Sequence, residues 1–290
     1  MRYVIVHETA LAFATPVREH HCELRLAPRD DEYQSRLRAT ITVEPEARLR
    51  PHTDCFGNLV HAFEVIAPHD SLRTRLEAEV ETKLANPFAY AAIPPGREDA
   101  WVQEALRASP PLWDFMLHRS TATPDLTRIA PELRPPTRPP GRAIVEAAQE
   151  AMAWVATQLD YRPGVTQAES PLAVALREGA GVCQDFAHLL IAVVRGWGVP
   201  ARYVMGYVDP GYAEDGTSEA AAATHAWAEV LVPGAGWRGF DPVHGLVAND
   251  TYVPVAIGRD YTDAAPQRGT FKGEDPGSVP TVTLHVVPQQ

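Results

Sequence analysis

Residues 179–190 read Gly-Ala-Gly-Val-Cys-Gln-Asp-Phe-Ala-His-Leu-Leu and mark the point where a glycine-rich loop meets an apolar helix. Cys183 lies at this junction. A helix start presents free backbone N–H groups and the positive end of the helix dipole, and both favour a thiolate over a thiol. Gly181, two residues earlier, is expected to leave room for a substrate carbonyl. Cys183 is therefore the candidate nucleophile.

An imidazole and a carboxylate follow Cys183 in the order that a Cys–His–Asp nucleophile system requires. His225 lies in the run Thr-His-Ala-Trp, and Asp241 lies in the run Gly-Phe-Asp-Pro. The imidazole would accept the thiol proton, and the carboxylate would fix the ring tautomer and stabilise its charged form. Alone, a cysteine at a helix start favours a structural role, and an aspartate before a proline favours a turn. Together, the three residues favour catalysis.

The turn between the strands of His225 and Asp241 decides whether these two side chains can meet. A three-residue loop, Pro233–Ala235, pairs Val232 with Gly236 and places His225 diagonally from Asp241 on one sheet face. The alternative register places the two residues directly opposite each other. A loop of even length would send them to opposite faces. Both registers therefore allow the pair.

Several segments carry a family resemblance. The segments "GAGVCQDFAHLL", "GVPARYVMGYV", "THAWAEVLVPGAGW" and "GFDPVHG" resemble the core of the transglutaminase-like superfamily in its bacterial form. The segments "YVIVHETALAFATPV", "LRLAPR" and "DCFGNLV" resemble the β-rich N-terminal region that accompanies that core, and "GRDYTDAAPQRGTFKG" resembles its closing segment. The resemblance covers nearly the whole chain except residues 94–140. Val243 and His244 stand where this family often has Thr and Asn, which bears on substrate preference rather than on the nucleophile.

The resemblance implies an α+β fold, with an N-terminal antiparallel β-sandwich followed by a papain-like transglutaminase core of helices packed on an antiparallel sheet. We expect the sandwich at residues 1–90, a proline-rich helical connector packed on the core at 91–141, and the catalytic core at 142–290. Alternating apolar and polar residues support the strands, because this pattern gathers apolar side chains on one sheet face. Two runs show it most clearly: Leu37, Ala39, Ile41 and Val43, and Leu72, Thr74, Leu76, Ala78 and Val80.

Two longer helices and several short ones are expected after the β-rich region. A helix should begin near Ile144, because apolar residues recur every three or four positions from there to Leu159. A second helix, apolar on most sides, should run from Cys183 to Trp197 and stop at Gly198. Proline pairs between residues 94 and 140 favour short helices there. Strands are expected at 201–208, 225–232, 237–241 and 279–287.

Composition excludes several classes of function. The chain of 290 residues has a formal net charge of −11 and no basic run, which argues against a nucleic-acid partner and against binding to an anionic membrane. No apolar stretch approaches membrane-spanning length, and the N-terminus lacks the apolar core of a signal peptide. Cys22, Cys55 and Cys183 are an odd number of cysteines, which favours a reducing compartment. We expect a cytoplasmic protein in which the first two are buried free thiols.

The predicted chemistry is cysteine-dependent acyl transfer on peptide or protein substrates, or on other amides, through a Cys183 thioester. Hydrolysis of the thioester, as in a peptidase or amidase, is favoured, and the alternative is an amine-accepting, cross-linking transglutaminase. A non-catalytic binding scaffold is the alternative from a different class. An arylamine acetyltransferase would share the Cys–His–Asp order, but the β-rich first 85 residues do not resemble that family. The oligomeric state is not predicted.

The oxyanion of this reaction needs two hydrogen-bond donors. The backbone N–H of Cys183 is one, and Tyr161 and the Gln184 side chain are candidates for the second. Asp185 and His188 are expected to anchor the helix of Cys183 rather than to act in the triad. The polar segment 209–223 is expected to border the active site. No cofactor and no metal are expected, because the only metal-like run, at residues 20–22, lacks a second cluster at ligand spacing.

Overall fold

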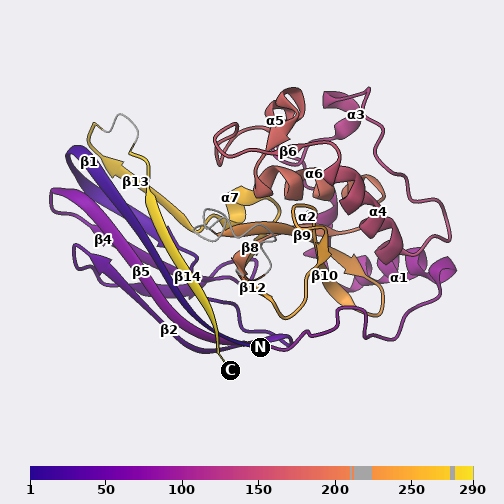
Figure 1. The fold of residues 1–290 in the computed structure, drawn as a ribbon, viewed down its shortest axis with the longest axis horizontal. Coiled ribbons are helices and arrows are strands. Elements are labelled where there is room, and N and C mark those ends of the chain that lie inside the picture. Colours follow the sequence, from indigo (N-terminus) through magenta and orange to yellow (C-terminus); the bar gives the residue numbers. More distant parts are fainter. Residues whose placement is uncertain (210, 212–223, 275–277, 290) are drawn as a thin grey trace.

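The computed structural model describes residues 1–209, 211, 224–274 and 278–289. Long strands of the N-terminal region lie on one side of the molecule, and the helices pack with a second sheet on the other side (Figure 1). The elements are, in chain order, β1 (Arg2–Leu24), β2 (Gln34–Glu44), β3 (Arg50–Thr53), β4 (Leu59–Val65), β5 (His69–Thr82), α1 (Pro95–Ala108), α2 (Leu112–Leu117), α3 (Leu126–Ile129), α4 (Ile144–Ala156), β6 (Asp160–Tyr161), α5 (Leu172–Glu178), β7 (Ala180–Gly181), α6 (Cys183–Gly196), β8 (Ala201–Val208), β9 (His225–Val232), β10 (Gly236–Asp241), β11 (Leu246–Val247), β12 (Tyr252–Gly258), α7 (Tyr261–Ala264), β13 (Gln267–Lys272) and β14 (Thr281–Gln289).

The N-terminal region is an antiparallel sheet of seven strands built around the long strand β1. The first half of β1 pairs with β5 and β14, and its second half pairs with β4 and β13. The pairing changes between Ala12 and Val17, where the register shifts. One strand therefore joins two antiparallel blocks. Together with the core described below, this arrangement confirms the expected α+β class.

The two C-terminal strands differ from expectation in their partners. We expected residues 142–290 to belong to the core, but β13 and β14 pair with β1 of the N-terminal sheet. Arg2 pairs with Gln289, so the two ends of the chain lie close together (Figure 1). Local alternation predicts that a segment is a strand, but it does not identify the distant edge that the strand joins.

The burial of β2 also differs from expectation. Leu37 is 46% exposed although the alternation predicted a buried position, whereas Val43 is buried. Among the described strands, β2 lies at the edge of the sheet with β5 as its one partner, and its register shifts between Arg36 and Arg38. Such an irregularity turns side chains away from the face that the alternation predicts. The predicted face of β5 is correct, because its alternate residues from Leu72 to Val80 are buried.

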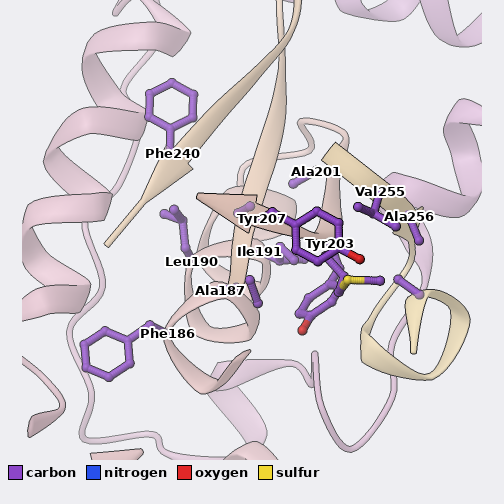
Figure 2. Packing of buried hydrophobic residues seen from close by; sticks show 14 of the residues in the cluster. Phe186, Ala187, Leu190, Ile191, Ala201, Tyr203, Tyr207, Phe240, Val255 and Ala256 are labelled. Carbon is purple, nitrogen blue, oxygen red and sulfur yellow. The ribbon is translucent and has the colours of Figure 1, made fainter. Parts of the chain in front are cut away.

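The core is a five-stranded antiparallel sheet in the order β11-β10-β9-β8-β12, and α6 packs against it. Ala226, Ala228 and Val230 of β9 share a buried cluster with the apolar side chains of α6. Figure 2 shows part of this cluster, with Leu190 and Ile191 of α6. The expected apolar stripe is buried in the same cluster, and it comprises Ile144, Ala148, Met152, Val155 and Leu159. α4 is shorter than expected, because it ends at Ala156 and Leu159 lies beyond it. The two predicted long helices are therefore both central to the core.

The other face of the core sheet carries a smaller apolar cluster around Trp227, which is fully buried. Residues of a strand point alternately to the two faces, so His225, Trp227 and Glu229 of β9 share this face. Val204 and Tyr252 pack with Trp227 there. This cluster therefore lies directly beside His225.

The connecting region, from α1 to α3, confirms the prediction of short helices only in part. α2 and α3 have 6 and 4 residues, but α1 has 14 residues and is as long as α6. This region is fixed to the core through Arg195 of α6. The buried Arg195 guanidinium donates to the carbonyl oxygens of Phe115 at 2.8 Å and His118 at 3.1 Å, and to the Thr123 hydroxyl at 3.1 Å. These bonds satisfy the backbone of α2 and of the loop that follows it. Among the described residues, no helix is long and apolar enough to cross a membrane.

Candidate active site

Cys183 is the first residue of α6, as predicted, and its side chain is half-buried. Its backbone N–H belongs to the first turn, whose N–H groups have no acceptor within the helix. Asp185 fixes this turn, because its Oδ2 accepts hydrogen bonds from the Val182 N–H at 2.8 Å and the Thr166 hydroxyl at 2.6 Å. His188 Nε2 accepts from the Tyr261 N–H at 3.1 Å. Asp185 and His188 therefore anchor the helix, as expected.

Gly181 has a different role from the one expected. A Cβ atom at this position would lie 2.6 Å from Asp185 Oδ2 and 2.8 Å from Asp185 Cβ. The absent side chain therefore makes room for the carboxylate that fixes the helix start, and not for a substrate carbonyl.

His225 and Asp241 meet on one face of the β9–β10 hairpin. Val232 pairs with Gly236, which is the register that places the two residues diagonally. The His225 Nε2–H donates to Asp241 Oδ2 at 2.7 Å. Residues 210 and 212–223, which we expected to border the active site, lie outside the described residues.

His225 also interacts with the side chain of Cys183, which contributes to the pKa of the ring. Because Nε2 donates to Asp241, Nδ1 is the ring nitrogen that remains for the thiol. Burial disfavours a charge on this ring, but the Asp241 carboxylate, with a contribution from Cys183, outweighs burial and raises the pKa of His225 to about 10. The ring is therefore an imidazolium at neutral pH, beside the sulfur that would carry the negative charge.

Asp241 is fully buried and surrounded by donors. Besides His225, its Oδ2 accepts from His244 Nδ1–H at 2.7 Å and from the Tyr252 hydroxyl at 2.8 Å. Its Oδ1 accepts from the Val243 N–H at 2.9 Å. Burial disfavours the charge of Asp241, but His225 and His244 outweigh burial and lower the pKa of Asp241 below its ordinary value.

Comparison with known proteins identifies the family. Residues 129–242 match the Transglutaminase-like superfamily, and residues 3–81 match the Bacterial transglutaminase-like N-terminal region. "Uncharacterized protein ML0607" of Mycobacterium leprae (strain TN) is 32% identical over 274 residues, which are 94% of each chain. The chain belongs to the transglutaminase-like superfamily.

Other members and structures resemble this transglutaminase-like chain over most of its length. "Uncharacterized protein Rv2569c" of Mycobacterium tuberculosis (strain ATCC 25618 / H37Rv) is 30% identical over 294 residues, covering 99% of this chain and 93% of the relative. A crystal structure from Cytophaga hutchinsonii, described as a "Putative Cysteine Protease", superposes with a TM-score of 0.75 at 20% identity. It matches 100% of this chain and 92% of its own. At 20% identity, the similarity to the Cytophaga hutchinsonii structure shows a shared fold alone.

The two candidates for the second oxyanion donor have different surroundings in this transglutaminase-like fold. Tyr161 lies on β6, which pairs with β7 so that Tyr161 is beside Gly181, two residues before Cys183. Burial is the main reason why the pKa of Tyr161 is raised, and the nearby Cys183 and Asp241 raise it further. The hydroxyl of Tyr161 therefore keeps its proton. The expectation for Gln184 is not supported, because its Nε2 already donates to the carbonyl oxygens of Gln167 at 2.9 Å and Ala168 at 3.2 Å. We retain Tyr161 as the candidate.

His225, Asp241 and His244 also bring three possible metal ligands within 4.8 Å of one another. However, the two imidazoles direct their N–H groups at the same oxygen, Asp241 Oδ2. A cation bound there would have to displace both hydrogen bonds. The arrangement therefore suits proton transfer better than metal binding.

Two of the residues that hold Asp241 were not predicted from the sequence as its partners. His244 was expected to affect substrate preference, although its position three residues after Asp241 was a usable signal. Tyr252 was not predicted at all. The other cysteines also differ from expectation in part, because Cys22 is buried but Cys55 is exposed, and all three are free thiols.

Proposed function

We propose that this protein is a cysteine-dependent acyl-transfer enzyme that hydrolyses peptides or other amides through a Cys183 thioester. The observation that carries the proposal is the position of His225, which interacts with Cys183 and donates to Asp241 at 2.7 Å. This is the geometry of an activated thiol nucleophile. The family and the fold support a cysteine-dependent enzyme.

In the first half of the reaction, the Cys183 thiolate attacks the carbonyl carbon of the substrate amide. The oxyanion that forms would accept hydrogen bonds from the Cys183 N–H and the Tyr161 hydroxyl. His225 Nδ1–H then gives its proton to the leaving nitrogen as the C–N bond breaks. The products of this half are a free amine and the Cys183 thioester, with His225 neutral.

In the second half, water attacks the thioester carbonyl and gives a proton to neutral His225. The C–S bond breaks, a carboxylic acid leaves, and the thiolate–imidazolium pair is restored. Solvent access supports water as the acceptor, because Cys183 is only half-buried and Tyr161 beside it is 48% exposed. An amine acceptor would use the same steps and would give a new amide.

We also propose the cytoplasm as the compartment. Cys22, Cys55 and Cys183 are all free, and Cys55 is exposed. Exposed free thiols favour a reducing compartment, because an oxidising one promotes disulfide formation.

Product analysis tests the proposal. The purified protein would be incubated with a peptide library in the presence and absence of a fluorescent primary amine, with Cys183→Ala as the blank. Hydrolysis predicts new peptide carboxylates by mass spectrometry, whereas dominant incorporation of the amine would establish transamidation instead.

Thiol labelling separates an enzyme from a binding scaffold. At pH 6, iodoacetamide should alkylate the half-buried Cys183 faster than the exposed Cys55, because only Cys183 has an imidazolium partner. If Cys55 reacts faster, exposure alone governs reactivity, and the scaffold becomes the better description.

A further inference from the structure

A cavity of about 320 Å³ lies between the N-terminal sheet and the core, on the side of the core where α7 faces that sheet (Figure 1). Its described wall comes from β1, β13 and β14 on one side, and from Thr224 and Tyr261 of the core on the other. Ligand sites occur preferentially at such boundaries, and their usual volumes run from about 300 to 1,000 Å³. The cavity therefore has the size of a site for one group of a ligand.

The core side of the cavity adjoins the catalytic residues. Thr224 immediately precedes His225 in the chain, and consecutive Cα atoms are only about 3.8 Å apart. The rings of Tyr203 and Tyr261 have centroids 6.3 Å apart. Burial is the main reason why the pKa of Tyr203 is raised, and Cys183 and Tyr261 both lie near enough to raise it further. The cavity is therefore next to the catalytic pair.

The cavity wall, as far as the structure describes it, contains no charged residue at neutral pH. Asp, Glu, Lys and Arg are all absent from its described lining. Burial lowers the pKa of His7 to about 4, and burial, together with neighbouring histidines, lowers the pKa of His20 to about 4. Both imidazoles are therefore neutral at pH 7. A charged group that entered the cavity would lose its hydration without meeting an opposite charge.

The hydrogen-bonding atoms of His7 are already engaged within the fold. The Tyr207 hydroxyl donates to the carbonyl oxygen of Leu26 at 3.0 Å, so it accepts from His7 Nδ1–H, also at 3.0 Å. His7 Nε2 then accepts from the Thr9 hydroxyl at 3.3 Å. This part of the wall therefore asks for no polar partner from a ligand.

Apolar side chains supply much of the wall. The rings of Phe13 and Phe271 pack edge to face, with centroids 5.3 Å apart. Leu11 and Val282 also line the cavity, and like Phe271 they are only half-buried. Their remaining exposed surface would leave water if an apolar group bound against it, which is favourable.

We propose that this cavity binds the side chain of a large, uncharged apolar residue of the peptide substrate, while a neighbouring amide of the same peptide reaches Cys183. The inference rests on the proposed function and names the substrate class that this function would select. An aliphatic or aromatic side chain matches the uncharged, apolar wall. A lysine or glutamate side chain at the same place would leave its charge unpaired. The protein would therefore cleave peptides close to apolar residues.

Calorimetric titration of Cys183→Ala protein measures binding to the cavity without turnover. The probes are the N-acetyl amides of phenylalanine, leucine, glycine and lysine, which differ only in the side chain. The first two should bind at least about tenfold more tightly than the glycine amide, because only they bury a large apolar side chain. The lysine amide should bind no better than the glycine amide, since its ammonium group finds no opposite charge.

Val282 and Val287 provide a matched pair of variants on β14. Val282 lines the cavity, whereas Val287 is 49% exposed and is not among the described lining residues. Val282→Asp should weaken binding of the phenylalanine amide by about tenfold or more, because it adds a carboxylate to the apolar wall. Val287→Asp should leave binding unchanged. Equal affinities in these two variants would overturn the cavity as the binding site.

A milder pair guards against unfolding of Val282→Asp. Threonine keeps the shape of valine and suits a strand, but it adds a hydroxyl group. Val282→Thr should therefore weaken binding of the phenylalanine amide by about threefold or more, and Val287→Thr should leave it unchanged. Equal affinities in this pair would overturn the site in the same way.

Thiol labelling of the wild-type protein tests whether the bound side chain lies beside the nucleophile. At about ten times its dissociation constant, the phenylalanine amide should slow the initial rate of Cys183 alkylation by roughly tenfold. Alkylation of the exposed Cys55 should be unaffected, which makes it the internal control. Equal rates of Cys183 labelling with and without the amide would overturn the proposed position of the site.

Peptide hydrolysis separates a failure of this inference from a failure of the proposed function. For peptides that differ in one residue next to the scissile amide, kcat/KM should be at least about tenfold higher with phenylalanine or leucine than with lysine or glutamate. Hydrolysis with equal kcat/KM for all four would overturn the substrate class and leave the proposed function intact. Binding of the apolar amides with no hydrolysis of any peptide would overturn the proposed function, and with it the role in substrate selection, while the cavity would remain an apolar binding site.

Discussion

Within the part of the chain that the structure describes, two cysteines lie beside a histidine, and one of these two pairs has the electrostatics of a nucleophile. In the N-terminal sheet, Cys22 Sγ lies 3.3 Å from His20 Nε2. Burial raises the pKa of Cys22 to about 12, although Gln267 opposes this, and burial lowers the pKa of His20 to about 4. Both groups are therefore neutral at pH 7. In the core, the pKa of His225 is instead raised to about 10.

The partner of each imidazole explains the difference. His20 Nδ1 contacts His69 Nε2 at 3.3 Å, so a second imidazole stands where His225 has the carboxylate of Asp241. The helix start of Cys183 adds about 0.3–1 kcal/mol, which is less than the roughly 1.4 kcal/mol of one pKa unit. Proximity of a thiol to an imidazole is therefore insufficient, and the carboxylate contributes the larger part.

Replacement of the cysteine in each pair by serine should give the largest effect on turnover. Cys183→Ser should lower turnover by about 10⁴-fold or more, because a serine hydroxyl stays protonated beside His225. Cys22→Ser, the matched change in the neutral contact, should leave turnover within about twofold of wild type. Circular dichroism would confirm that both variants fold. An active Cys183→Ser protein would remove Cys183 from the mechanism.

The next largest effect should come from replacing the histidine of each pair by alanine, which distinguishes the two pairs by turnover and by the pH profile of Cys183 alkylation. His225→Ala should lose nearly all turnover and should move the midpoint of the pH profile of Cys183 alkylation upward, toward the ordinary thiol value of about 8.5. His20→Ala should destabilise the buried N-terminal cluster but leave that midpoint unchanged. Identical profiles in wild type and His225→Ala would mean that no thiolate–imidazolium pair exists.

Asp241→Asn tests the role of the carboxylate itself. The side chain keeps its shape but loses its charge, so the imidazolium is less stable and the ring tautomer is less well fixed. We expect this variant to keep about 10 to 100 times more turnover than Cys183→Ser, and to shift the alkylation midpoint less than His225→Ala does. A larger shift than that of His225→Ala would contradict this order of roles.

Much of this site could be predicted from the sequence because its determinants are local. The start of α6 follows from glycines before an apolar run, and the odd loop at Pro233–Ala235 fixes the common face of His225 and Asp241. In contrast, Tyr252 reaches Asp241 from β12, at the far side of the sheet from β10. No spacing in the sequence relates these two strands. The sheet order must be known first.

The incorrect predictions of the fold have the same cause. A strand was expected at residues 279–287 and is observed as β14, but its partner β1 lies more than 250 residues away in the sequence. From the sequence alone, the side-chain amide of Gln184 was expected to be available as an oxyanion donor. In the structure it already donates to the carbonyl oxygens of Gln167 and Ala168, which a preceding loop brings close to it. Local patterns specify elements, whereas distant contacts decide which polar groups remain available.

The two histidines should also give opposite pH dependences of stability. The pKa of His225 is raised from 6.5 to about 10, so its contribution is full below pH 6.5 and is lost as the pH rises toward 10. The pKa of His20 is lowered from 6.5 to about 4, so its contribution is full above pH 6.5 and is lost as the pH falls toward 4. Denaturant unfolding of wild type, His225→Gln and His20→Gln across this range would measure both slopes. Slopes of the same sign would contradict the comparison.

The smallest effect should come from the hydroxyl of Tyr252. Tyr252→Phe removes one donor to Asp241 and should lower stability by about 1.5–3 kcal/mol, because the acceptor is charged. It should also raise the alkylation midpoint of Cys183 by less than Asp241→Asn does, since His225 and His244 still hold the carboxylate. Tyr207→Phe is the matched control, because that buried hydroxyl donates to the carbonyl oxygen of Leu26 at 3.0 Å, a neutral acceptor. The control should lower stability without moving the midpoint. If both variants leave the midpoint unchanged, the Tyr252 hydroxyl stabilises the fold and has no part in the charge of the catalytic pair.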